Sequence, residues 1–264
     1  MSIELKKYYL FTALFLIVTV SSAYAQYNDT INVSAERIDS EYYKFSYKQL
    51  IIPSALMAYG TVETVLAPNY NLLNNALADE VNTRKPRRLR IDDVSLAVPA
   101  LSVYALNLAG IEGKHNFKDR TIILAMASAF ALGSVNVIKY TTKVERPDKS
   151  KRNSFPSGHT AIAFMGAEFL WQEYKDVSPW YGVAGYTVAT ATGLLRIHNN
   201  KHWFGDVAFG AGVGILSTKL AYWLYPSVEK KLFNSERKDN KIQSLALYPY
   251  YDGYQGGLGF MMGW

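Results

Sequence analysis

Long apolar segments rich in small residues recur along the chain, and short polar, mostly basic stretches separate them. Each segment is too long for a β-strand and lacks the strict alternation of a half-buried strand. The pattern predicts helices over residues 49–66, 91–109, 119–142, 158–174, 180–197 and 205–225. We therefore expect an all-α fold, a bundle of about six helices whose polar loops gather at the helix ends.

The N-terminal segment has a different character. Two lysines precede an apolar run over residues 8–20, and an A-x-A pattern follows that run. This three-part order predicts a secretory signal peptide over residues 1–25, with an uncleaved membrane anchor as the alternative. A polar lead over residues 26–48 comes next. Either interpretation delivers the rest of the protein across a membrane, and a cysteine-free exported chain fits a bacterial periplasm.

The C-terminal segment, residues 229–264, also departs from the helical pattern. It begins with a charged linker over residues 230–241, and two segments rich in aromatic residues then flank a turn-like sequence at residues 252–256. The pattern predicts a short β-hairpin-like tail after a helical domain over residues 49–228. Two strands cannot close a barrel, so we expect this tail to pack on the helical domain.

Composition and charge narrow the class of partner. The chain has 264 residues, of which 49% are hydrophobic and 19% charged, and its formal net charge is +6. A positive chain favours anionic partners, such as phosphorylated small molecules or acidic lipid headgroups. We expect no nucleic-acid partner, because the sequence has neither zinc-finger spacing nor a basic region with heptads.

The sequence gives conflicting signals on whether the helices span a bilayer. Some predicted helices are long enough, but the first contains Pro53 and Glu63, and the mean hydropathy of the chain is near zero. If a cleaved signal peptide preceded six spanning helices, the polar loops after the third and fifth helices would face the cytoplasm. An exported protein would then have these loops on the wrong side of the membrane. We therefore expect an exported domain that does not span the membrane with all six helices, either soluble or associated with the membrane surface.

The first of three blocks that suggest chemistry is Lys139, followed after six residues by Arg146 and Pro147. We place Lys139 in the last turn of a helix, and Pro147 biases Arg146 towards an extended backbone. Two cations so placed can reach one point beyond the helix end, where an arginine grips phosphate through two donors. Taken alone, the same residues are ordinary at a helix C-terminus, where they complement the helix dipole.

The second block is the sequence Pro-Ser-Gly-His-Thr at residues 156–160, which opens a predicted helix. Ser157 can cap that helix, and Gly158 permits a ligand to approach the backbone closely. Free N–H groups and the positive end of the helix dipole form an anion site, beside which His159 can act as general acid or base. Taken alone, the block is equally a capped helix with an exposed histidine.

The third block is Arg196, followed by His202 after five residues and by Asp206 after three more. Arg196 offers a further phosphate contact at a helix end. In a His–Asp pair of this kind the carboxylate keeps one ring nitrogen protonated and leaves the other free to attack. Taken alone, the pair is more often a surface hydrogen bond. His198 lies nearby, but its spacing to Asp206 does not suit this pairing.

Together the three blocks resemble the type 2 phosphatidic acid phosphatase family, which also includes bacterial acid phosphatases and vanadium haloperoxidases. The family pattern is K-x6-RP, then PSGH, then R-x5-H-x3-D, and the chain departs from it at Leu195, where the family usually has serine or glycine. The matching positions are Lys139, Arg146, Pro147, Pro156, Ser157, Gly158, His159, Arg196, His202 and Asp206.

The resemblance implies a helical phosphatase that works through a phosphohistidine intermediate. It implies that His202 is the nucleophile, that Asp206 orients it, and that His159 protonates the leaving oxygen and later activates water. The implied phosphate-binding residues are Lys139, Arg146, Ser157, Gly158 and Arg196. We expect no metal and no cofactor, because these cations would do what Mg²⁺ does in other phosphatases.

Two other functions stay open at this point. In the haloperoxidases of the same family the pocket holds vanadate, and the position that matches His202 binds vanadium. A non-catalytic envelope scaffold would instead account for the aromatic tail. The substrate of a phosphatase is equally open among phospholipids, isoprenoid diphosphates, lipid A and soluble esters. Apolar helices and basic loops over residues 82–90 and 143–152 favour an amphiphilic, membrane-derived substrate.

Overall fold

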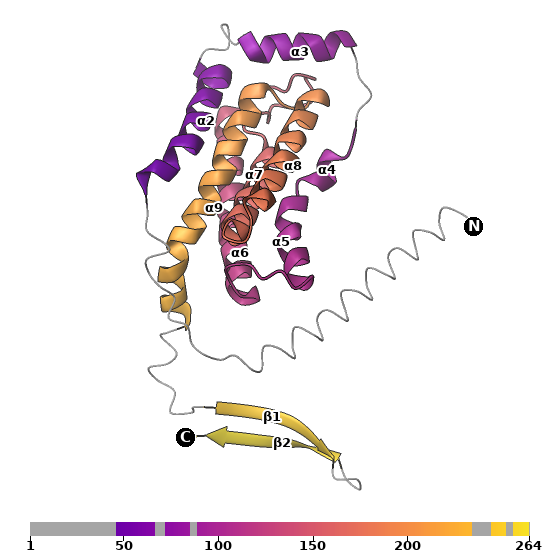
Figure 1. Ribbon diagram of the computed structural model, residues 1–264. Coiled ribbons are helices and arrows are strands. Elements are labelled where there is room, and N and C mark those ends of the chain that lie inside the picture. Colours follow the sequence, from indigo (N-terminus) through magenta and orange to yellow (C-terminus); the bar gives the residue numbers. More distant parts are fainter. Residues whose placement is uncertain (1–45, 67–71, 85–88, 234–243, 252–255, 264) are drawn as a thin grey trace, which may run out of the picture. The chain divides into compact units, whose positions relative to one another are not determined.

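The computed structural model of the protein describes residues 46–66, 72–84, 89–233, 244–251 and 256–263. The predicted signal peptide lies outside these residues. Within them the chain forms eight α-helices, α2 to α9, and one pair of strands (Figure 1). The predicted all-α fold is confirmed. The chain divides into two compact units, with the boundary after Trp223.

The N-terminal part of the helical unit consists of short elements. They are the 3₁₀ turn Tyr47–Leu50, α2 (Ile51–Thr61), the π-helical turn Val62–Leu66, α3 (Leu72–Arg84), α4 (Asp92–Ser95) and α5 (Val98–Leu108). Helix α3 was not predicted. Its buried face carries Asn74, which is 2% exposed, in place of an apolar residue, so the hydrophobic period fails at the position that packs.

The single helix predicted over residues 91–109 is wrong, because the structure divides it into α4 and α5. Pro99 lies at the start of α5. A proline has no N–H to donate, and its ring would clash with the carbonyl of Ser95, four residues earlier in a continuous helix. The chain therefore ends one helix at Ser95 and begins the next with Pro99 in its first turn, where proline is tolerated.

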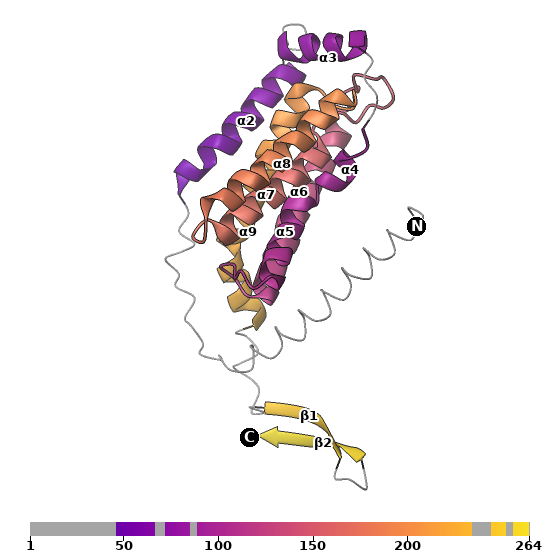
Figure 2. The same ribbon diagram turned by 45° about the vertical axis from the view of Figure 1, so that its right-hand side comes forward.

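Four longer helices make up the rest of the bundle. They are α6 (Phe117–Thr142), α7 (Gly158–Tyr174), α8 (Pro179–His198) and α9 (Phe204–Phe233). Helix α7 has the predicted bounds and packs against α5, α6 and α8 (Figures 1 and 2). It is buried over most of its length and forms the centre of the bundle.

Two glycines bring α9 close to α7. A Cβ atom on Gly210 would lie 2.5 Å from the carbonyl oxygen of Ser157, and one on Gly214 would overlap the carbonyl oxygen of Ala161. Real Cβ atoms essentially never approach that closely. Small residues four positions apart permit two helix backbones to come together in this way. The contact at Ser157 places the N-terminus of α7 directly against α9.

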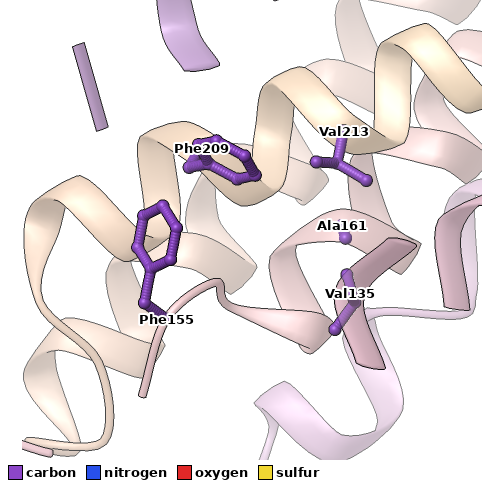
Figure 3. Packing of buried hydrophobic residues seen from close by; sticks show 5 residues of the cluster. All are labelled: Val135, Phe155, Ala161, Phe209 and Val213. Carbon is purple, nitrogen blue, oxygen red and sulfur yellow. The ribbon is translucent and has the colours of Figure 1, made fainter. Parts of the chain in front are cut away.

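An apolar cluster lies beneath the same helix ends. It consists of Val135 of α6, Ala161 of α7, Phe209 and Val213 of α9, and Phe155 from the segment before α7 (Figure 3). The rings of Phe155 and Phe209 have their centroids 4.6 Å apart. Burying an aromatic side chain stabilises a fold by about 1.5–3 kcal/mol. The cluster therefore fixes the segment that leads into α7.

Within the residues that the structure describes, three helical stretches are long and apolar enough to cross a membrane. They are Tyr47–Leu66, Phe117–Thr142 and Phe204–Lys231. Of the two expected alternatives, a soluble domain and a membrane-associated one, these stretches favour the membrane-associated protein. Glu63 does not exclude the first stretch, because its carboxylate accepts hydrogen bonds from the N–H groups of Leu73 (3.1 Å) and Asn74 (3.0 Å) in the first turn of α3.

The second unit contains the last turns of α9 and an antiparallel strand pair. Strand β1 (Ser244–Tyr251) pairs with β2 (Gly256–Gly263) in a register that runs from Ser244 opposite Gly263 to Tyr251 opposite Gly256. The predicted hairpin is confirmed. Helix α9 continues to Phe233 and includes Pro226, so the predicted start of the charged linker at residue 230 is wrong. Its remaining residues, 234–241, lie outside the described part of the chain.

Candidate active site

Hydrogen bonds join the three sequence blocks at one end of the helical unit. The blocks come from the C-terminal ends of α6 and α8 and the N-terminal ends of α7 and α9. The backbone N–H of Ser157, which caps α7, donates to the main-chain carbonyl of Asp206 in α9 at 3.0 Å. Lys139 of α6 donates through Nζ to the carbonyl of Asn153 at 2.6 Å, in the segment that leads to α7. Residues far apart in the sequence therefore meet in one place.

The predicted His–Asp pair is formed and is buried. Nδ1 of His202 lies 3.3 Å from Oδ2 of Asp206, and the two residues are 3% and 0% exposed. Because a carboxylate accepts, Nδ1 carries the proton and Nε2 keeps its lone pair. The pair therefore has the hydrogen-bonding arrangement of an activated histidine nucleophile.

Asp206 is held by more than the histidine. Its Oδ2 also accepts hydrogen bonds from the hydroxyl of Ser154 and, at 2.9 Å, from the backbone N–H of Trp203. Its Oδ1 is buried and has no hydrogen-bond partner within the described residues. Three donors on one oxygen restrict the carboxylate to one orientation, and it orients the imidazole in turn.

Burial lowers the pKa of His202 to about 4. The hydrogen bond and charge of Asp206 act in the opposite direction, while the positive charges of Lys139 and Arg196 lower the pKa further. A histidine with a pKa below the physiological range is neutral at pH 7. The lone pair on Nε2 is therefore available without a prior deprotonation.

The second block places Ser157 as the cap of α7. Its hydroxyl lies 2.8 Å from Oγ1 of Thr160 and accepts from the Thr160 N–H at 3.5 Å. The residue is fully buried. A Cβ atom on Gly158 would meet only Val135, at 3.5 Å. The side chain of Ser157 thus stabilises the helix terminus, whose dipole is positive at this end.

The three predicted cations lie around the same region. Nε of Arg146 and Nε of Arg196 are both buried and have no hydrogen-bond partner among the described residues. Burial lowers the pKa of Arg146, and the nearby charge of Arg196 adds to this effect. Two guanidinium groups with unused donors and like charges are stabilised when an anion binds between them.

The loop between Lys143 and Ser154 carries Arg146 on a fixed backbone. The N–H of Ser154 donates to the carbonyl of Val144 at 2.9 Å, and the N–H of Arg146 donates to the carbonyl of Lys151 at 3.0 Å. The side chains of Lys149, Lys151 and Arg152 are exposed. The main chain of the loop is therefore closed on itself, with Arg146 partly buried at the site and Lys149, Lys151 and Arg152 on the surface.

His159 lies at the edge of the site rather than inside it. Its Nε2 is 3.0 Å from Oδ1 of Asp93 in α4, and its side chain is 33% exposed. The sequence did not indicate this carboxylate. Its neighbour Asp92, also in α4, is 2% exposed and accepts a hydrogen bond from Nη1 of Arg196.

Four residues at the site escaped the sequence analysis: Asp92, Asp93, Ser154 and Asn199. Asn199 donates through Nδ2 to Asp92 at 3.2 Å, and Ser154 bonds Asp206. None of the four belongs to a spacing pattern with a known chemical use. Asp92 and Asp93 precede the nearest block by more than forty residues, so only the fold brings them to the site. Among the described residues no three His, Cys, Asp or Glu side chains are grouped to hold a metal ion.

Comparison with known proteins gives a family match over part of the chain. Residues 120–230 match the sequence model of the PAP2 superfamily. The matched segment contains all three blocks. The chain is therefore similar to the PAP2 superfamily over these residues, and the family resemblance inferred from the blocks is confirmed.

Two curated proteins are similar over part of their length. The chain is 45% identical over 136 residues to lipid A 1-phosphatase of Porphyromonas gingivalis, a match that spans 51% of this chain and 31% of that protein. It is 34% identical over 101 residues to the bacitracin transport permease protein BcrC of Bacillus licheniformis, spanning 33% of this chain and 48% of that one. The chain thus matches less than half the length of either relative.

Two solved structures are also similar. Aquifex aeolicus LpxE has a TM-score of 0.42 at 23% identity, with 56% of this chain and 94% of that chain covered. The first transmembrane PAP2-type phosphatidylglycerolphosphate phosphatase from Bacillus subtilis has a TM-score of 0.46 at 20% identity, with 69% and 97% covered.

Proposed function

We propose that this protein is a phosphatase that hydrolyses phosphate monoesters or diphosphates on lipid-linked substrates through a phosphohistidine at His202. The observation that carries the proposal is the buried pair of His202 and Asp206, 3.3 Å apart, close to Arg196 in the last turn of α8 and Arg146 in the loop after α6. A neutral imidazole beside cations with unused donors suits phosphoryl transfer without a metal ion.

In the first step Nε2 of His202 attacks phosphorus in line with the leaving oxygen. The N–P bond forms, the P–O bond to the leaving group breaks, and His159 gives its proton to the leaving oxygen. Nδ1–H remains on Asp206, whose negative charge stabilises the positive imidazole ring. The leaving alcohol or phosphate departs with the proton from His159.

In the second step water attacks the same phosphorus atom. His159, now neutral, takes the proton of that water, the N–P bond breaks, and its electron pair returns to Nε2. Inorganic phosphate is released, His202 is neutral again, and His159 is again protonated. In both steps Lys139, Arg146 and Arg196 stabilise the charge that spreads over the equatorial oxygens, with Ser157 and Gly158 at the helix terminus.

The lipid-linked substrate is supported by two observations. Three helices in the described part of the chain are apolar enough to lie in a membrane, and a relative that is 45% identical over 136 residues is named for lipid A 1-phosphatase activity. We propose that residues 49–228 form the catalytic domain and that it is exported to the periplasmic side, after a signal peptide over residues 1–25. We propose a phosphorylated amphiphile as its partner, and no nucleic acid.

Phosphate release by the purified protein in EDTA tests this function, with a short-chain lipid phosphate and a soluble aryl phosphate in parallel. We expect release from the lipid phosphate, its loss in His202→Ala, and normal release in His198→Ala, a histidine four positions away that serves as the matched control. Brief incubation with ³²P-labelled substrate should trap an acid-labile, base-stable phosphoprotein in the wild type and none in His202→Ala. Wild-type turnover in His202→Ala contradicts the assignment.

A further inference from the structure

The short helix α4 is tied to α8 at three places. Asp92 accepts hydrogen bonds from Arg196 and from Nδ2 of Asn199, and the hydroxyl of Ser95 lies 2.8 Å from that of Thr192. In the segment just before α4, the backbone of residue 89 exchanges two hydrogen bonds with the side chain of Asn199, at 2.9 and 2.7 Å. A four-residue helix has little stability of its own. These ties therefore give α4 a defined position relative to the site.

The two adjacent carboxylates of α4 face different surroundings. Asp92 is buried against Arg196, whereas the side chain of Asp93 is 60% exposed and lies 3.0 Å from Nε2 of His159. Asp93 is farther from Arg196, with 3.9 Å between its Oδ1 and Nη1. Asp92 therefore forms the ion pair with Arg196, and Asp93 is the carboxylate that contacts His159.

The site therefore contains two Asp–His pairs that hold opposite ring nitrogens. Asp206 contacts Nδ1 of His202 and leaves Nε2 open, whereas Asp93 contacts Nε2 of His159 and leaves Nδ1 open. Nδ1 of His159 has no hydrogen-bond partner in the part of the chain that the structure describes. The buried pair suits a neutral nucleophile, and the exposed pair suits a group that exchanges protons with a leaving group and with water.

We infer that Asp93 is a positioning residue of the reaction, which holds His159 through Nε2–H so that Nδ1 delivers the proton to the leaving oxygen. This inference rests on the proposed function. Nε2–H stays on Asp93 through both steps, while Nδ1 loses its proton to the leaving oxygen and regains one from the attacking water. A carboxylate on the far nitrogen fixes the tautomer and stabilises the imidazolium that must be present when the leaving group departs.

The charges around His159 have opposing effects on its protonation. Burial lowers the pKa of His159 and the charge of Arg196 in α8 lowers it further, while Asp93 raises it through its hydrogen bond and charge, and Asp92 raises it through its charge. Loss of the negative charge at residue 93 therefore lowers the pKa of His159. Because a general acid works only while protonated, the basic limb of the rate profile then moves to lower pH.

The leaving group separates a positioning role from a structural one. An alkoxide is strongly basic and must be protonated as it departs, whereas a nitrophenolate is a good leaving group without a proton. We expect Asp93→Ala to lower kcat/KM, which reports the step in which the leaving group departs, on an alkyl phosphate such as octyl phosphate by about tenfold to a hundredfold, and on p-nitrophenyl phosphate by less than about threefold. His159→Ala should show the same selectivity with a larger loss.

Two further variants complete the experiment, which uses the full chain in detergent. Asp93→Asn keeps an acceptor oxygen and should recover part of the octyl phosphate rate, while the basic limb of its pH–rate profile still moves to lower pH. Asp176→Ala, an exposed carboxylate near the opposite end of α7, is the control and should change neither rate.

The outcomes are distinct. Equal losses on the two substrates in Asp93→Ala, or no loss on either, overturn the inference while leaving the proposed function intact, provided that the wild type is active. An unchanged basic limb in Asp93→Asn also overturns it. A folded wild type that cleaves neither substrate overturns the proposed function, and the positioning role of Asp93 falls with it.

Discussion

The backbone N–H of Ser157 and the main-chain carbonyl of Asp206 are joined by a hydrogen bond of 3.0 Å. This bond connects the cap of α7 with the first turn of α9, and it does not depend on the chemistry of either side chain. The residue that orients the proposed nucleophile and the helix terminus proposed to face phosphate are therefore held together through the backbone.

Gly210→Ala should destabilise the protein. The added Cβ atom would lie 2.5 Å from the carbonyl oxygen of Ser157, so α7 and α9 must move apart. Overpacking of this kind costs about 1–3 kcal/mol. Thermal unfolding in detergent measures the change. Gly133→Ala is the matched control, because no heavy atom lies within 4 Å of a Cβ at that position, and it should be neutral or stabilising by up to about 1 kcal/mol. Equal melting temperatures for the two variants contradict the prediction.

Orthovanadate should bind the site and raise the melting temperature, because the buried Nε donors of Arg146 and Arg196 have no partner in the described part of the chain. Arg146→Lys replaces a two-donor fork with a single charged group. We expect the Kd for vanadate to rise about tenfold, the loss of one hydrogen bond to a charged group. Arg152→Lys, exposed on the same loop, should bind vanadate as the wild type does. A wild-type Kd in Arg146→Lys shows that this guanidinium does not contact the anion.

The stability of the protein should fall between pH 6.5 and pH 4 on account of His202. Its pKa is lowered from 6.5 to about 4 in the folded state, so the unfolded chain binds the proton more readily. The contribution is fully present above pH 6.5 and is lost as the pH falls through 4. It amounts to about 3 kcal/mol at 1.36 kcal/mol for each pKa unit.

Thermal unfolding at pH 7.5 and pH 5 measures this dependence. His202→Gln has no proton to gain in this range, so its melting temperature should change less between the two pH values than that of the wild type. An equal change in both proteins assigns the acid sensitivity to other groups.

The helices that consist mainly of apolar and small residues could be predicted from the sequence, whereas the helix with a polar residue on its buried face was missed. Helix α7 has the predicted bounds because Ser157 is a standard cap and most of the residues that follow it are apolar or small. Helix α3 was missed because the buried position on its face is the polar Asn74. The side chain of Asn74 hydrogen-bonds the main chain, and its Oδ1 accepts from the N–H of Gly205 at 2.9 Å. A buried amide cannot be distinguished from an exposed one by residue type alone.

The part of the candidate site that could be predicted consists of residues at a fixed, short spacing in the sequence. His202 and Asp206 lie within one helical turn of each other, so their pairing follows from local geometry. The pairing of Asp93 with His159 spans 66 residues, and nothing in the sequence indicates that α4 folds against α8 there. The roles of all these residues stay predictions until the variants are measured.

The closed main chain of the loop between Lys143 and Ser154 has a consequence for how the protein can diverge. Its main chain is held by internal backbone hydrogen bonds, so the exposed side chains of Lys151 and Arg152 can change without moving Arg146 or Ser154. Lys149, which has a positive φ, and Ser150, whose hydroxyl bonds Asp148, are more constrained. Substitutions at residues 151 and 152 should therefore change the charge of the loop surface and leave the proposed phosphate-binding residues in place. A library randomised at these two positions tests whether this surface contributes to the substrate specificity of the proposed phosphatase.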